Sequence, residues 1–213
     1  MKMTKTKLLV ALLALMLVLA ACGGGNGNGN GEIEDVGPVY RGVISGDTYT
    51  SSFIGLSFTL PENWVFAGDA EIAAMMGIAA NVLAAEDIDF DAANIETLYD
   101  MLASNPLTGD NIMVMIEDLT LTSPLAPLIP TRVYLDELKA QMEELDFADY
   151  VFADDFQVTI GGQTWDVLSA NVDMMGMEIE QHYLVRRQGN YMIAIIATFM
   201  GDMSFDDMMS YFS

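Results

Sequence analysis

The order of apolar and polar positions divides the chain into an apolar run, a glycine-rich stretch and a long region with strand and helix patterns. The apolar run extends from Leu8 to Ala21, behind three lysines and directly before Cys22. Its fourteen residues would form a helix about 21 Å long, short of the roughly 30 Å hydrocarbon core of a bilayer. The run therefore predicts the apolar core of an export signal rather than a transmembrane helix.

The end of this run carries a second pattern. Leu19-Ala20-Ala21-Cys22 resembles the lipobox of bacterial lipoproteins, in which a bulky residue and two small ones precede the cysteine that receives lipid, and Cys22 is the only cysteine. We therefore predict a signal peptide over residues 1–21, lipid attachment at Cys22 and anchoring at the extracytoplasmic face of the cell membrane. An ordinary secretory signal with a chance cysteine is the alternative.

The glycine-rich stretch after the cysteine predicts a flexible tether. Residues 23–31 read GGGNGNGNG, a sequence with no apolar surface to bury. A glycine-rich coil of this length has an end-to-end distance of about 17 Å. We assign residues 22–48 to the lipidated cysteine, the tether and a lead-in, and residues 49–213 to one folded domain.

Beyond the tether, the spacing of apolar residues predicts both strands and helices. The segment from Leu56 to Leu60 alternates with period two and stops at Pro61, which is typical of a strand. The expected strands are 56–60, 111–117, 156–160, 164–172, 178–187 and 191–199, and the expected helices are 70–85, 132–145 and 204–212. Two glycine-containing turns, at 161–162 and 188–190, connect the last strands as hairpins. We therefore predict an α+β fold, a single domain with a meander-type antiparallel sheet flanked by helices.

Two segments carry a resemblance to a known family. Phe53 to Trp64 reads FIGLSFTLPENW, and Gln181 to Ile193 reads QHYLVRRQGNYMI. The first resembles the opening strand of PsbP/Mog1-like domains, and the second is similar to the paired C-terminal strands of such domains in bacterial lipoproteins. The resemblance covers about residues 49–213. It implies an antiparallel sheet with helices and varied binding or assembly roles, and it transfers no site residue.

The charge of the chain limits its partners. The chain has 31 acidic and 8 basic residues, a formal net charge of −23. Removal of the signal peptide would leave five basic residues, so the mature chain would carry −26. Such a surface is a poor partner for nucleic acid, whose binding depends on Lys and Arg. It also disfavours attachment to an anionic membrane through a basic patch, and a lipid anchor would have to hold the protein.

The residues available for catalysis favour a protein that is not an enzyme. His182 is the only histidine, so a Ser-His-acid triad would have to use it. We expect it to lie in solvent beside Glu180, on the more polar face of its strand. We therefore predict a noncatalytic binding or assembly module with an unknown protein partner. A hydrolase that depends on carboxylates is a less favoured alternative.

Two patterns suggest metal binding without completing a site. Asp87, Asp89 and Asp91 have the spacing of an EF-hand start, but the glycine and the final glutamate of that loop are missing. Three methionines, Met174, Met175 and Met177, could bind Cu(I) together with His182, and copper handling is therefore an alternative function. Methionine also fills cores and forms adaptable partner surfaces. Because a glycine-containing turn joins the flanking strands and no second histidine is available, we predict an exposed hairpin tip at 174–177 and no resident metal or cofactor.

The expected helix 70–85 is apolar almost all round. Ile72 and the methionines after it should pack on the sheet. The opposite side has only small residues, which would allow another backbone to approach closely: Ala73, Ala74, Gly77, Ala80 and Ala84. Such a helix must be covered. Either the segment from Asp87 to Pro106 covers it, or a partner does, and the small residues would then form the binding site.

Overall fold

The computed structural model describes residues 36–78, 83, 88–90, 95–122, 129–145, 148–174 and 176–213. The signal peptide, Cys22 and the tether therefore lie outside the described residues. Within the described part of the chain, no helix is both long and apolar enough to cross a bilayer.

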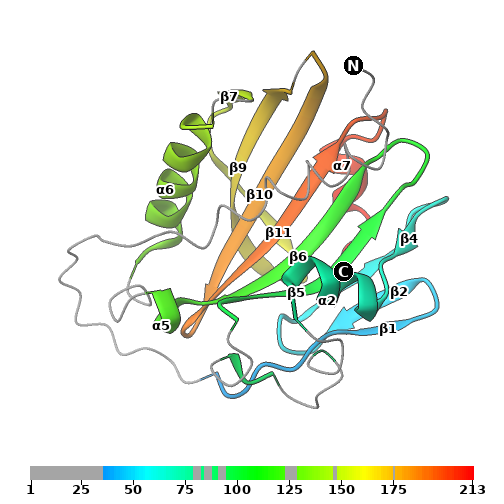
Figure 1. Ribbon diagram of the computed structural model, residues 1–213, viewed down its shortest axis with the longest axis vertical. Helices are drawn as coiled ribbons and strands as arrows, with labels where there is room; N and C mark the ends of the chain where they lie inside the picture. Colours follow the sequence, from blue (N-terminus) through cyan, green and yellow to red (C-terminus); the bar gives the residue numbers. More distant parts are fainter. Residues whose placement is uncertain are drawn as a thin grey trace.

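The described residues form one large and one small antiparallel sheet (Figure 1). The small sheet has the order β1-β2-β3, and the large one has the order β4-β5-β6-β11-β10-β9-β7, with β8 also paired to β9. Their strands are β1 (Val43–Ser45), β2 (Thr48–Ser51), β3 (Leu56–Thr59), β4 (Val65–Phe66), β5 (Thr97–Ser104), β6 (Asn111–Asp118), β7 (Asp149–Phe152), β8 (Phe156–Ile160), β9 (Gln163–Asp173), β10 (Glu178–Gln188) and β11 (Tyr191–Phe199).

The long hairpins β8–β9 and β10–β11 confirm the predicted C-terminal meander. Gly161 and Gly162 connect β8 to β9, and both have positive φ, as a two-residue hairpin turn of type I′ requires. Gly189 has a φ of 56° at the first position of the turn between β10 and β11. These backbone conformations are costly for residues with a Cβ, which explains why glycine stands at each position.

Helices are fewer and shorter than the predicted architecture implied. They are α2 (Asp69–Met76), α5 (Leu119–Thr122), α6 (Thr131–Glu143) and α7 (Phe205–Met209). Of these, only α6 exceeds eight residues in the described part of the chain. It buries Leu135, Leu138 and Met142 against the large sheet, as their spacing predicts. The fold is α+β and sheet-rich, and "flanked by helices" overstates the helical layer.

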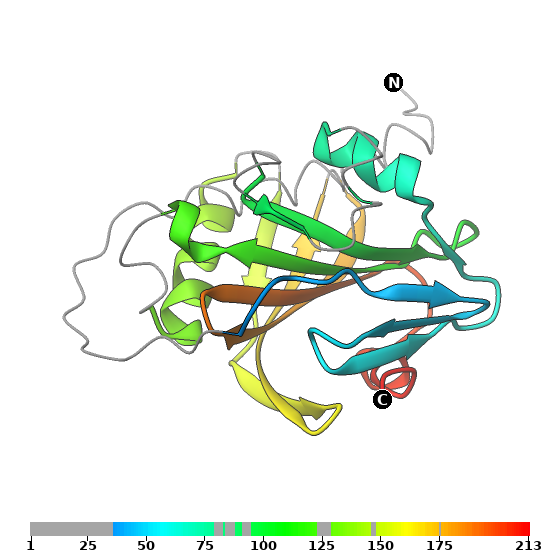
Figure 2. The ribbon, with the colours of Figure 1, turned by 90° about the horizontal axis from the view of Figure 1, so that it is seen from below.

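The two sheets pack together in a layered arrangement. In Figure 2 the small sheet and α7 lie below the large sheet, and α2 lies above it. The small sheet is attached to β10 through Arg186, which donates to the carbonyl oxygen of Ile54 at 2.9 Å. The C-terminus continues the small sheet, because Ser57 and Ser213 exchange two backbone hydrogen bonds. Phe58 is fully buried, and Trp64 is also buried.

One helix prediction needs correction. The helix that begins after Gly68 ends at Met76 and does not reach Ala85 as one helix, because Gly77 adopts the left-handed conformation with a φ of 68°. At the start of α6, Pro130 takes the cap position, and the hydroxyl of Thr131 donates to Asp166 on β9.

Several strands lacked a recognisable pattern in the sequence. In β5, positions 98–103 are all buried, so polar and apolar residues do not alternate in the way that marks a half-exposed strand. This strand lies within the segment 87–106, and α2 packs on it. Packing also begins before residue 49: Val39 is fully buried and forms an isolated bridge with Ile88.

Candidate functional site

One end of the large sheet has a face that no helix of the described chain covers. Consecutive residues of a strand point to opposite faces, so the pairing register shows which side chains share this face. One cross-strand row contains Asp149 of β7, Asp173 of β9 and Glu178 of β10. The adjacent row contains the following side chains: Val151, Asn171, Glu180 and Phe199.

These two rows line a groove with a volume of about 590 Å³. The end of β11 and the residues after it, Phe199 to Gly201, form one wall. Phe199 is buried, whereas Val151 is 68% exposed and offers an apolar surface between the carboxylates. In Figure 1 this end of the sheet is the upper one, where β7, β9 and β10 end near one another.

The groove is strongly anionic. Asp149 and Asp173 are direct cross-strand partners, and so are Asp173 and Glu178. Like charges placed directly opposite each other destabilise a sheet. Among the described residues, the ion pairs include no Lys or Arg bonded to a groove carboxylate, and Glu180 pairs with His182. The groove therefore presents negative potential to solvent.

The only histidine lies one row farther into the sheet, beside the groove. Its Nε2 lies 2.8 Å from Oε1 of Glu180, and its Nδ1 lies 2.6 Å from the hydroxyl oxygen of Ser169. With Glu180 ionised, Nε2 carries the hydrogen and Nδ1 accepts from Ser169. The order of groups, hydroxyl, imidazole and carboxylate, is that of a Ser-His-acid triad.

The exposure of these groups is opposite to that of an acyl-transfer site. Ser169 is 7% exposed and His182 only 5%, whereas the side chain of Glu180 is 47% exposed. Phe205 of α7 stacks on the imidazole with a centroid distance of 4.2 Å. A nucleophile must be reached by the substrate, but here the carboxylate faces solvent and the hydroxyl is buried.

The prediction of a solvated histidine is therefore wrong. The proximity to Glu180 is correct, but α7 and Phe199 bury the ring. Burial lowers the pKa of His182, and the nearby carboxylates of Glu180 and Asp206 oppose this effect only in part. The signal that sequence reasoning missed was Phe205, since an aromatic residue at the start of a short helix can cover the sheet.

A buried carboxylate holds the wall of the groove in place. Asp110, after the loop between β5 and β6, accepts hydrogen bonds from the backbone N–H groups of Met200 and Gly201 at 2.7 and 2.8 Å. Its second oxygen accepts from the hydroxyl of Thr108 at 2.7 Å. Hydrogen bonds to an ionised acceptor are stronger than neutral ones, so Asp110 is a positioning residue for this wall.

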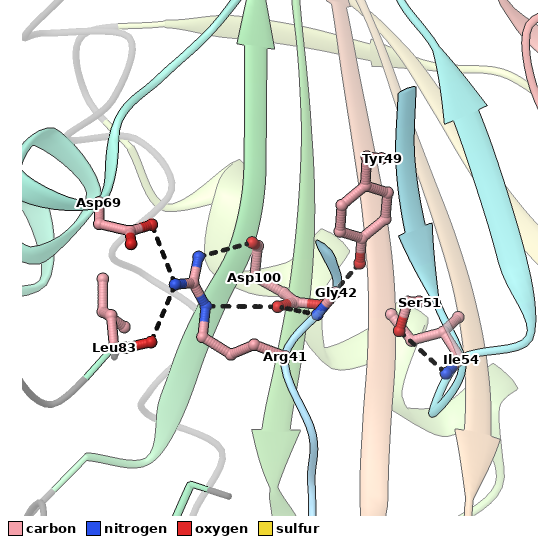
Figure 3. A network of polar contacts seen from close by, with 8 residues as sticks. All are labelled: Arg41, Gly42, Tyr49, Ser51, Ile54, Asp69, Leu83 and Asp100. Carbon is pink, nitrogen blue, oxygen red and sulfur yellow. Dashed lines mark hydrogen bonds and ion pairs between the residues drawn. The ribbon is translucent and has the colours of Figure 1, made fainter. Parts of the chain in front are cut away.

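A second buried carboxylate fastens the lead-in to the large sheet (Figure 3). Asp100 of β5 is 1% exposed and accepts from the backbone N–H of Gly42 and from the hydroxyl of Tyr49 at 2.5 Å. The guanidinium of Arg41 lies 3.5 Å from this carboxylate and donates to Asp69 at 3.0 Å. Burial raises the pKa of Asp100. The network joins the lead-in, β2, β5 and α2.

The predicted partner-binding residues lie partly outside the described chain. Ala73 is buried in the core, Ala74 and Gly77 are exposed, and Ala80 and Ala84 fall outside the described residues. The described residues therefore contain only part of the predicted small-residue side.

The copper set of three methionines and His182 does not come together. Met177 precedes the first residue of β10, and His182 is five residues farther along, a separation of about 16 Å in a strand. Met174 is buried under the sheet with Val172 and Ile179, so the prediction of an exposed tip is wrong for this residue. Met175 lies outside the described residues.

The EF-hand-like pattern is described only in part. Asp89 is exposed, whereas Ile88 and Phe90 beside it are buried, and the N–H of Ile88 donates to the carbonyl oxygen of Val39 at 3.0 Å. Asp87 and Asp91 lie outside the described residues. Among the residues that are described, no group of three or more His, Cys, Asp or Glu side chains is placed to hold a metal ion.

The sequence contained only part of the signal for the groove. Polar residues occur at every second position at the ends of β9 and β10, as in Asn171 and Asp173 or Glu178 and Glu180. This alternation predicts an open face. It does not reveal that Asp149, separated from them in the sequence, joins the same row.

Comparison with known proteins gives solved structures of low similarity. No family model matches this chain, and no curated protein matches it. The solution structure of cyanobacterial PsbP (CyanoP) from Synechocystis sp. PCC 6803 is similar over 89% of this chain and 97% of its own, with 15% identity and a TM-score of 0.46. A crystal structure from Bacteroides thetaiotaomicron shows 15% identity and a TM-score of 0.36, covering 80% of this chain and 48% of its own.

The first of these structures is a PsbP, of the family that the strand patterns of this chain resemble. Function is therefore inferred from the residues of the chain itself.

Proposed function

We propose that this protein is a lipid-anchored, extracytoplasmic binding or assembly module without catalytic activity. The observation that carries the proposal is the burial of its only histidine. His182 and Ser169 have the hydrogen-bonding order of a triad, but Phe205 covers the imidazole and Ser169 is buried. Ser169 and His182 therefore belong to the packing of α7 on the sheet.

Three buried carboxylates also accept hydrogen bonds from groups within the protein. Asp100 and Asp110 accept backbone N–H groups, and Glu117 accepts the hydroxyl of Tyr134 at 2.7 Å. In the described part of the chain, the open groove at the end of the large sheet is available to a partner. An open face with a fixed charge pattern is suited to binding.

The anchor rests on the sequence. Leu19-Ala20-Ala21-Cys22 follows a short apolar run and precedes a glycine-rich stretch, the arrangement of a lipidated N-terminus. The strongly acidic chain has no basic surface for adsorption to anionic lipids, so acyl chains on Cys22 would provide the attachment.

One complementation experiment tests both parts. Cells lacking the protein receive the wild type, Cys22→Ala or Ser169→Ala, and are labelled with a radioactive fatty acid. We expect label and membrane attachment with the wild type and Ser169→Ala, and neither with Cys22→Ala. We also expect Ser169→Ala to restore the wild-type phenotype to the deletion cells, because the Ser169 hydroxyl bonds to a buried histidine and takes no part in catalysis.

Asn26→Ala, a substitution in the tether, is the control and should be labelled like the wild type. Label that persists in Cys22→Ala would refute the anchor. Loss of function in Ser169→Ala, with folded protein at normal abundance, would refute the noncatalytic assignment.

A further inference from the structure

We propose that the outer face of the small sheet lies against the lipid surface to which Cys22 anchors the chain. This inference rests on the proposed function and specifies which face of the domain meets the membrane. Strand register defines the face, because direct cross-strand partners lie on the same side of a sheet. The inner side carries Tyr49 and Phe58, which are fully buried. The outer side carries the alternate residues, which are exposed or half-exposed: Val43, Ser45, Thr48, Thr50, Ser57 and Thr59.

The outer face is uncharged in a strongly acidic protein. Residues 36–60, which include the whole small sheet, contain one of the 31 acidic residues, Asp47 at the β1–β2 turn, and one basic residue, Arg41. An anionic leaflet repels carboxylates, and a carboxylate that meets the apolar part of a bilayer loses its hydration. The small sheet can therefore approach lipid at little electrostatic cost.

The same segment exposes apolar side chains that suit the boundary of a bilayer. Val43 on the outer face is 66% exposed, Ile44 in the edge strand β1 is 40% exposed, and Tyr40 just before this strand is 45% exposed. Tyrosine is enriched at membrane–water interfaces, where its ring meets the apolar boundary and its hydroxyl meets the headgroups. The serine and threonine hydroxyls around Val43 can donate hydrogen bonds to phosphate and ester oxygens of lipid.

The position of the predicted anchor brings this face close to the membrane. Fourteen peptide bonds (36 − 22) join Cys22 to Val36. A glycine-rich coil of this length has an end-to-end distance of about 20 Å. The network in Figure 3 fixes the lead-in to the large sheet, so the chain enters the domain directly before β1. The connection includes Glu32, Glu34 and Asp35, which an anionic leaflet would repel, and the test therefore uses zwitterionic lipid.

This orientation also suits the rest of the molecule. In Figure 1 the small sheet lies at the lower right, whereas the groove lies at the upper end of the large sheet. With the small sheet on lipid, the carboxylates of Asp149, Asp173 and Glu178 stay in water, where the groove is open to a partner.

The test uses the full-length lipidated protein, extracted from its own membrane and reconstituted into phosphatidylcholine vesicles with or without bromine on the acyl chains. Brominated chains quench tryptophan fluorescence on contact. Val43→Trp is the reporter, and Val151→Trp is the matched control, because Val151 is 68% exposed in β7, an edge strand of the large sheet. Trp64 and Trp165 are buried and give the same background in every variant. We expect bromine to remove about half of the added fluorescence of Val43→Trp and less than about a tenth of that of Val151→Trp.

A further substitution tests whether the native face, rather than the added tryptophan, makes the contact. Thr50 is the exposed cross-strand partner of Val43, so Thr50→Glu places a carboxylate beside the reporter. Combined with Val43→Trp, it should reduce quenching to the level of the control, with a melting temperature close to that of Val43→Trp alone. Undiminished quenching in the folded double variant would overturn the inference.

The other possible occupants of the face give different results. Equal quenching of both reporters would mean that the domain has no preferred face toward lipid, and the inference would be wrong. It would also be wrong if bromine quenched neither reporter. A blue shift of Val43→Trp that rises with protein density in the vesicles, without quenching, would show that a second copy covers the face. A blue shift seen only in native membranes would show a protein partner.

Flotation of the vesicles in a density gradient separates this inference from the proposed anchor. Protein that floats with the vesicles but shows no difference between the two reporters contradicts the inference alone. Protein that does not float contradicts the anchor at Cys22, and the inference fails with it. Neither result affects Ser169→Ala complementation, which tests the noncatalytic assignment.

Discussion

At the scale of the residue, His182 shows how burial determines the role of a reactive side chain. Both ring nitrogens have partners within the protein, and an aromatic ring covers the imidazole. Burial disfavours the charged form and lowers the pKa of His182, with partial compensation from Glu180 and Asp206. A histidine held neutral in this way links folding to pH.

The direction of that linkage gives a prediction. The pKa of the folded state lies below the ordinary value of 6.5, so just below pH 6.5 the unfolded chain binds more protons. Stability is therefore fully present above pH 6.5 and falls as the pH decreases toward the folded pKa. Thermal unfolding between about pH 7.5 and about pH 5 should show a smaller decrease for His182→Gln than for the wild type. The carboxylates other than His182's partners contribute equally to both proteins. An equal decrease of the melting temperature with pH in the wild type and in His182→Gln would contradict the role of His182.

At the scale of the element, α2 shows how one glycine sets the end of a helix. Gly77 donates to the carbonyl oxygen of Ala74 and Ile78 to that of Ala73, the two hydrogen bonds of a Schellman motif. The left-handed φ of 68° at Gly77 directs the chain out of the helix. Apolar residues continue beyond this point, which is why periodicity alone predicted a longer helix.

Substitution of this glycine should have a graded effect. Gly77→Ala should lower the free energy of unfolding by about 1 kcal/mol, because a Cβ is disfavoured at this φ. Gly77→Asn should lose less, since asparagine tolerates the left-handed region. Urea denaturation with both variants measures the difference. An alanine variant as stable as the wild type would mean that the helix can extend without cost.

At the scale of the whole molecule, the network of Arg41 and Asp100 connects the start of the fold to the large sheet. Asp100 lies in the middle of β5 with almost no exposure, and Arg41 comes from the segment that follows the tether. The guanidinium also donates to the carbonyl oxygen of Leu83 at 3.1 Å. The lead-in is therefore fixed to the domain well before the strand at 48–51.

Removal of the guanidinium should destabilise the entire domain. Arg41→Ala leaves a buried carboxylate without its cation and should cost about 3 kcal/mol in the free energy of unfolding. The control is Arg132→Ala, which breaks ion pairs of a half-exposed arginine with Asp136 and Asp155 and should cost less than about 1 kcal/mol. The free energy of unfolding is measured by denaturation with guanidinium chloride. Equal losses in the two variants would show that the buried pair contributes no more to stability than the exposed pairs.

The local sequence pattern was sufficient to predict the strands, turns and helix faces that depend on neighbouring residues. Strands 156–160 and 191–199 have the predicted bounds, because alternation and glycine turns are encoded within a few residues. The face of α6 that carries Leu135 and Leu138 was likewise evident from helical spacing. The export signal and the lipobox pattern are linear features that a fold does not alter, and their prediction rests on the sequence alone.

Only the tertiary structure decided which distant residues meet. Strand register places Asp149 beside Asp173, α7 brings Phe205 onto His182, and β5 brings Asp100 to Arg41. None of these pairs can be read from spacing, because each depends on how layers pack across many residues of chain. The sequence by itself determined where the C-terminal strands and their turns lie, and it alone supports the predicted anchor. Packing decided that the histidine is buried and that the carboxylates form a groove, because burial and proximity are properties of the assembled layers.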